Sequence, residues 1–178
     1  MQSALGWRSH SGWAVLVAVR EPASSPEVLA RRRVELVDGS LPRQPYHAIA
    51  ERGLSVRAGE ALIERVERTA LATAVAATES VLEAGALDAV GVVGRTRRIP
   101  DGLEKILASH ALLHAAEGDL FERALIDAAA HLGLRAFKLE PAAIRIPAAV
   151  DSAGKALGPP WQKDHKLAAA VALAALQK

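Results

Sequence analysis

The first forty residues carry the hydrophobic pattern of β-strands. Residues 13–19 form an apolar run rich in β-branched side chains, and residues 28–37 alternate apolar and charged positions, as a half-buried strand does. A short mixed stretch at residues 3–7 comes before them, and the turn-forming residues 9–12 separate it from the apolar run. The pattern therefore predicts three consecutive strands joined by short connections.

From residue 55 onward the apolar positions recur every three or four residues, which is the period of a helix. The pattern predicts one long helix over residues 55–84, which Gly85 ends. The five apolar residues 89–93 then predict a short buried strand.

Helical spacing returns at residue 99. We expect Gly118 to interrupt it, because Asp119 and Glu122 resemble a capping box that starts a new helix over residues 120–132. Two further elements complete the chain: a strand over residues 134–139 and an alanine-rich helix over residues 162–176 with most of its circumference buried.

The composition narrows the classes of protein to consider. About half of the 178 residues are hydrophobic and none is cysteine, which excludes disulfides, thiolate metal sites and cysteine nucleophiles and fits a cytoplasmic location. No apolar run reaches the ~20 residues that a membrane span needs, and we expect no signal peptide and no membrane partner. The net charge of +2 does not by itself demand a nucleic-acid partner. The length suits a single domain over residues 1–178.

The order of three strands followed by alternating helices and strands resembles the ribonuclease H-like fold of Holliday-junction resolvases, transposases and actin-like ATPases. Residues 5–15 are similar to the first hairpin of the resolvase-type members, and Asp164 lies near the start of a last helix similar to theirs. Residues 109–118 also resemble a set of uncharacterised bacterial proteins. The resemblance implies an α/β fold with a mixed five-stranded sheet, three strands of it antiparallel, flanked by helices.

The same resemblance implies a metal site that this sequence departs from. In the nucleases, carboxylates from the first strand, the fourth strand and the last helix hold two Mg²⁺ ions. Here Arg8 occupies the first position, Gly94 and Arg95 end the fourth strand, and only Asp164 matches. A guanidinium would repel Mg²⁺, so we do not expect ordinary family chemistry unless Glu117 or Asp119 approaches the same place.

A different metal site is one hypothesis. His110, His114 and Glu117 have the spacing of one helix face, although the glutamate of a His-Glu-x-x-His motif is absent. We expect the side chains of four residues to converge despite their separation in sequence: His10, His114, Glu117 and Asp164. Two histidines and two carboxylates would suit Zn²⁺, Mn²⁺ or Fe²⁺ better than Mg²⁺. The catalytic residues of an active enzyme would be Asp164, Glu117 and His10. A plain hydrogen-bond network of these polar residues is the alternative.

Phosphate binding is the second chemical hypothesis. Arg95, Arg97 and Arg98 directly follow the strand at 89–93, where ligands bind in open α/β sheets, and Arg8 would join them. The run Arg31-Arg32-Arg33 lies in a predicted strand, so its side chains alternate between faces, as is typical of a solvated surface.

Together these features favour a divergent ribonuclease H-like protein that acts on or binds nucleic acid or another phosphate-bearing ligand. If it is an enzyme, it would be a metal-dependent phosphodiester hydrolase with a divalent metal ion as cofactor. The alternative is a non-catalytic interaction or scaffold module. The apolar face of the helix over residues 55–84 could pack internally or against a second copy, which leaves a homodimer open.

Overall fold

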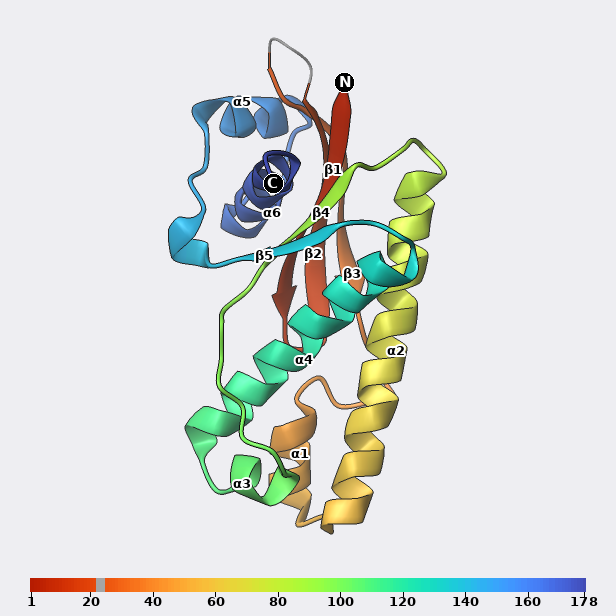
Figure 1. The fold of residues 1–178 in the computed structure, drawn as a ribbon, viewed down its shortest axis with the longest axis vertical. Helices are drawn as coiled ribbons and strands as arrows, with labels where there is room; N and C mark the ends of the chain where they lie inside the picture. The colour runs from red at the N-terminus through yellow and green to blue at the C-terminus, as the bar shows by residue number, and fades with distance from the viewer. Residues whose placement is uncertain (22–24) are drawn as a thin grey trace.

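A mixed five-stranded sheet forms the centre of the molecule. The computed structural model describes residues 1–21 and 25–178. Strands β1 (Gln2–His10), β2 (Trp13–Glu21) and β3 (Glu27–Glu35) form an antiparallel meander, and β4 (Ala89–Val93) and β5 (Ala136–Leu139) continue the sheet parallel to β1. The strand order is β3-β2-β1-β4-β5 (Figure 1). The predicted fold class is confirmed.

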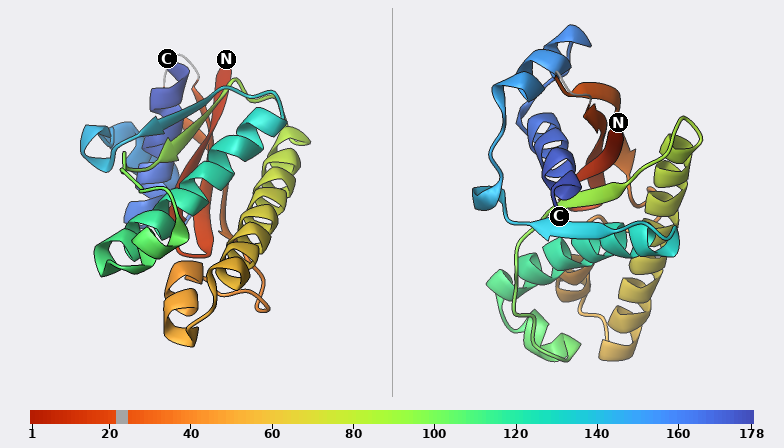
Figure 2. Two further views of the ribbon diagram at one scale, coloured as in Figure 1. Left: turned by 60° about the horizontal axis from the view of Figure 1, so that its bottom comes forward. Right: turned by 45° about the horizontal axis from the view of Figure 1, so that its top comes forward.

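Helices cover both faces of this sheet (Figures 1 and 2). One face packs against the long helices α2 (Val56–Leu82) and α4 (His110–His131), with the short helices α1 (Pro45–Arg52) and α3 (Leu103–Leu107) beside their ends. The other face packs against α6 (Lys163–Leu176), next to α5 (Ala148–Ala156) and a short 3-10 helix (Pro141–Ala143). None of the helices in the described part of the chain is long and apolar enough to cross a membrane.

The alternation of side chains along β1 divides the core into two layers. Leu5 and Trp7 are fully buried against α2 and α4, whereas Ala4 lies in the layer under α6. The α6 layer is unusually thin because glycines face the helix: a Cβ built on Gly6 would lie 1.8 Å from the carbonyl oxygen of Ala168, and one on Gly91 would lie 2.3 Å from that of Val171. The helix backbone therefore rests directly on β1 and β4.

Helix α4 differs from the prediction, because it runs unbroken through Gly118. The glycine makes room for a neighbour there: a Cβ at this position would lie 2.8 Å from the Arg97 guanidinium. Asp119 does not cap a new helix but forms an i,i+4 ion pair with Arg123. The predicted interruption was wrong.

Two short helices lie in segments to which the hydrophobic pattern assigned no strand or helix. Helix α1 starts at Pro45, where a proline fits because the first helical N–H needs no partner. Helix α5 follows Pro147 within the long connection after β5. Both have nine residues or fewer, which is too short for the helical period to stand out from the sequence.

Candidate functional site

The carboxyl ends of three parallel strands meet at one edge of the sheet. Strand β4 pairs in parallel with both β1 and β5, so the residues that follow Arg8, Val93 and Leu139 emerge side by side. In open α/β sheets, ligands bind at this edge. Helix α6 runs with its first turn toward the same edge, as the contacts of Asp164 show.

Asp164 joins the first strand to the last helix. Its Oδ2 lies 2.9 Å from His10 Nε2, and its Oδ1 lies 3.7 Å from Arg8 Nε. All three side chains are about 30% exposed, with Arg8 at 27%, His10 at 30% and Asp164 at 31%. The structure thus places His10 beside Asp164, as the sequence predicted, and adds Arg8 to the same group.

His10 is held in place by an aromatic stack that the sequence analysis did not predict. Its ring stacks on Trp13, with ring centroids 4.1 Å apart and an interplanar angle of 10°. The Arg33 guanidinium lies 3.7 Å from the centroid of the same indole. Two groups this close cannot share one face of the ring, so the indole is sandwiched between them and offers no free face to a nucleobase.

The arginines after β4 do not all point to solvent. Arg97 Nη1 donates to Glu122 Oε2 at 2.7 Å, and the backbone N–H of Arg95 donates to the same oxygen at 3.1 Å. Glu122 is buried, and Lys138 Nζ lies 3.8 Å from it. Arg97 therefore anchors the segment after β4 to helix α4, whereas the side chains of Arg95 and Arg98 are exposed.

The same segment is tied to the end of β5. The backbone N–H of Thr96 donates to Glu140 Oε1 at 2.9 Å. This hydrogen bond, together with one from the Thr96 side chain and the nearby Arg95 and Arg97, lowers the pKa of Glu140. Glu122 and Glu140 thus fix the segment that presents Arg95 and Arg98. Sequence reasoning missed both anchors, because they act across 25 to 44 positions of the chain.

The other two residues of the predicted cluster lie in a separate place. Glu117 is buried in α4, and its Oε1 accepts hydrogen bonds from His47 Nδ1 at 2.9 Å and from the His47 backbone N–H at 3.2 Å. His114 lies next to His110 on the same helix. The four residues thus fall into two sets, because α4 and α6 pack on opposite faces of the sheet (Figure 2).

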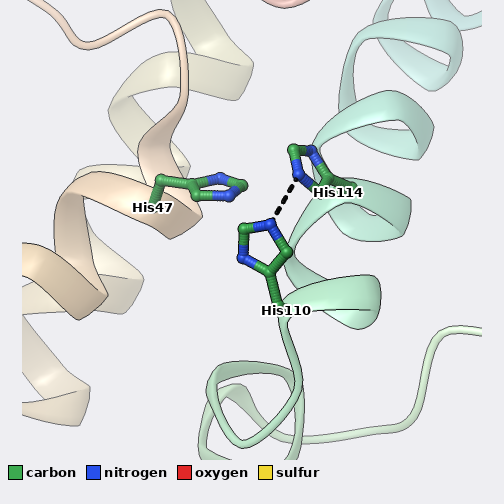
Figure 3. Close-up of side chains that lie close together, drawn as sticks. All are labelled: His47, His110 and His114. Carbon is green, nitrogen blue, oxygen red and sulfur yellow. Dashed lines mark hydrogen bonds between the residues drawn. The ribbon is translucent and has the colours of Figure 1, made fainter.

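Figure 3 shows His114 with its two neighbours, His47 and His110. Within the described part of the chain, the group with the geometry to hold a metal ion consists of His47, His110 and His114, whose ligand atoms lie within 4.8 Å of one another. Sequence reasoning found His110 and His114 from their spacing but missed His47. The sequence signal for His47 was its imidazole side chain alone, in a segment to which the hydrophobic pattern assigned no strand or helix.

The sequence matches no protein-family model and no curated protein. Two solved structures are similar over nearly the whole chain. RuvC of Thermus thermophilus in complex with a Holliday junction substrate aligns with a TM-score of 0.60 and 14% identity, over 97% of this chain and 91% of that chain. A second structure of T. thermophilus RuvC aligns with a TM-score of 0.56 and 14% identity, over 97% of this chain and 92% of that chain.

This chain has the ribonuclease H-like fold of the resolvases. The fold explains why the first strand, the fourth strand and the last helix meet at one edge of the sheet. At 14% identity the likeness extends to the fold alone, and the activity has to be argued from the residues at that edge.

Proposed function

We propose that this protein binds structured nucleic acid through phosphate contacts at the carboxyl edge of its sheet, without the two-metal cleavage reaction of the resolvases. The observation that carries the proposal is the position of Arg8. Its guanidinium lies against Asp164 at the place where the resemblance implies a metal-holding carboxylate on the first strand. A fixed positive charge there suits a phosphate group.

The donor set around Asp164 does not fit a pair of Mg²⁺ ions, and the other two carboxylates at this edge, Glu122 and Glu140, are bonded to Arg97 and to the Thr96 N–H. Hard cations need several oxygen ligands, and two-metal sites share carboxylates between the ions. The side chains around Asp164 supply one carboxylate, one imidazole and one guanidinium. The guanidinium already neutralises the carboxylate, so a divalent cation would meet little net negative charge.

Arg95 and Arg98 extend the positive charge along the edge. Both side chains are exposed, and their backbone is held by Glu122 and Glu140, so the segment is positioned before a ligand arrives. Guanidinium groups recognise phosphate oxygens with paired hydrogen bonds. Because Trp13 has no free face, recognition would depend on phosphate contacts rather than on base stacking.

A four-way DNA junction is the natural first probe, because one structure with this fold was determined with a Holliday junction substrate. Fluorescence anisotropy should compare the junction with duplex and single-stranded DNA of matched length over a range of salt concentrations. We expect the junction to bind most tightly, and log affinity to fall linearly with log salt.

Three charge-reversal variants localise the contacts. Arg95→Glu and Arg98→Glu should each weaken binding about tenfold or more and reduce the salt slope by roughly one unit or more. Arg135→Glu is the matched control, since it makes the same charge change on an exposed residue just before β5, at the amino end of that strand and away from the carboxyl edge. An equal loss in all three variants would mean that the binding follows overall charge and not this edge.

Two further outcomes would overturn the proposal. The absence of binding to any probe at low salt would favour a protein-interaction module with the same fold. Junction cleavage in the presence of Mg²⁺ or Mn²⁺ that disappears in Asp164→Asn would show that the edge is a nuclease site.

A further inference from the structure

The histidine cluster between α1 and α4 is separate from the sheet edge and has no part in the proposed nucleic-acid contacts. His110 and His114 lie one turn apart at the start of α4, and His47 reaches them from α1 (Figure 3). The ring centroid of His47 lies 5.2 Å from that of His110 and 4.6 Å from that of His114. The ring centroids of His110 and His114 are 4.6 Å apart.

We propose that His47, His110 and His114 bind one Zn²⁺ ion, with Glu117 as the carboxylate that orients His47. Three imidazoles are a common protein ligand set for Zn²⁺. The chain contains no cysteine, so nitrogen and oxygen atoms are the only strong donors available to a metal.

The contact between His47 and Glu117 determines which nitrogen of the His47 ring can bind a metal ion. A carboxylate can only accept, so His47 Nδ1 carries the proton that is donated to Glu117 Oε1 at 2.9 Å. The lone pair of His47 therefore lies on Nε2, the other nitrogen of the ring. Metal-binding histidines usually have this second hydrogen bond, which fixes the tautomer and the orientation of the ring.

The distance between the two helix α4 histidines also fits a shared ion. His110 Nε2 and His114 Nε2 lie 3.1 Å apart. Two Zn–N bonds of about 2.0–2.1 Å at a tetrahedral angle place their nitrogens about 3.3 Å apart. A ring nitrogen of His47 already lies within the 4.8 Å span of the group, and small rotations of the imidazoles would close the site.

Burial of Glu117 supplies a second reason for a cation here. The residue is 1% exposed, and its Oε2 has no hydrogen-bond partner among the described residues. A buried carboxylate with an unsatisfied oxygen is costly, and a divalent cation on the neighbouring imidazole would offset part of that cost.

The surroundings of the cluster indicate an open site. His110 and His114 are exposed, while His47 is only 15% exposed. Three protein ligands on the surface leave the fourth tetrahedral position to water, which is the arrangement of catalytic and not of structural zinc sites. The ion would also connect α1 to α4 and so stabilise the short helix.

The test uses untagged protein that has been stripped with a chelator and then titrated with Zn²⁺ in a calorimeter. We expect one ion per chain, and a rise of roughly 5–10 °C in the melting temperature at a free Zn²⁺ concentration of about 100 times the dissociation constant. Co²⁺ should give the intense visible absorption of a tetrahedral complex with nitrogen ligands.

The variants separate this site from weak binding to surface histidines. His110→Ala and His114→Ala should each abolish the one-to-one binding and the cobalt spectrum, whereas His131→Ala, which removes an exposed histidine at the other end of α4, should change neither. Glu117→Gln should weaken Zn²⁺ binding about 10- to 100-fold while the melting temperature of the metal-free protein stays near that of wild type.

Zinc binding that is equal in wild type, His114→Ala and His131→Ala would overturn the proposal, and so would the absence of one-to-one binding by the wild type. These readouts contain no nucleic acid, so their failure would leave the proposed nucleic-acid binding untouched.

Discussion

His10 Nε2 lies 2.9 Å from Asp164 Oδ2 although 154 positions separate the two residues in the chain. The contact exists because Gly6 and Gly91 let α6 rest directly on β1 and β4, which brings the first turn of the helix to the ends of both strands. Asp164 therefore holds His10 and lies next to Arg8, and its negative charge opposes the positive charge that a phosphate group would use.

The first prediction follows from this opposition of charges. Asp164→Asn should raise the affinity for nucleic acid by about three- to tenfold at low salt, since one charge at about 4 Å in a solvated setting is worth on the order of 1 kcal/mol. Arg8→Gln should lower the affinity by a similar factor. Anisotropy titrations at fixed salt measure both effects.

Asp127→Asn is the matched control, because it neutralises an exposed aspartate on α4 and should leave the affinity within about twofold. If Asp164→Asn weakened binding instead, the carboxylate would favour nucleic-acid binding, and the proposed role of Arg8 would have to be abandoned.

The second prediction concerns the buried pair of Arg97 and Glu122. Arg97→Met leaves the buried Glu122 with the Arg95 N–H at 3.1 Å and the Lys138 ammonium at 3.8 Å, and it should lower the free energy of unfolding by about 3 kcal/mol. Adding Glu122→Gln should restore much of the loss, because an amide oxygen can still accept from the Arg95 N–H.

Urea unfolding of the two single variants and the double variant completes a mutant cycle for this pair. Additive losses, with no recovery in the double variant, would show that the ion pair does not hold the segment after β4 in place.

The strand and helix pattern was predictable because local sequence determines it. The five apolar residues of β4 were predicted with its observed bounds, and α2 begins after Ser55, whose side chain caps the helix.

The parts of the sites that were missed depend on pairs of residues far apart in the sequence. His47 meets Glu117 across 70 positions, and Gly118 accommodates a guanidinium from another segment, so the glycine resembled a helix break when only its neighbours were considered.

The third prediction tests the close contact that positions α6. A Cβ on Gly6 would lie 1.8 Å from the carbonyl oxygen of Ala168, and backbone cannot move aside as a side chain can. Gly6→Ala should therefore destabilise the protein by about 3 kcal/mol or more, measured by urea unfolding. Gly85→Ala serves as the control, because nothing lies within 4 Å of a Cβ built at this position. The free energy of unfolding of this variant should stay within about 1 kcal/mol of wild type.

If Gly6→Ala proved as stable as Gly85→Ala, α6 could shift away from the sheet without cost. The contact of Asp164 with His10 would then not depend on the thin layer under the helix.

The last prediction concerns pH and the segment that presents Arg95 and Arg98. The hydrogen bond from the Thr96 N–H to Glu140 Oε1 favours the charged carboxylate and so lowers the pKa of Glu140 in the folded protein. A lowered folded pKa contributes stability that is fully present above the unfolded value of about 4.3 and is lost as the pH falls through the folded pKa.

A carboxyl-carbon NMR titration should therefore give Glu140 a midpoint below about 4.3. Urea unfolding between pH 7 and pH 3 should show Glu140→Gln less stable than wild type at pH 7, with the difference shrinking as the pH falls below about 4.3. A midpoint at or above the unfolded value, or two stability profiles that stay parallel over the whole range, would contradict the prediction. Because this hydrogen bond joins the segment after β4 to the end of β5, protonation of Glu140 should also increase amide exchange at Thr96.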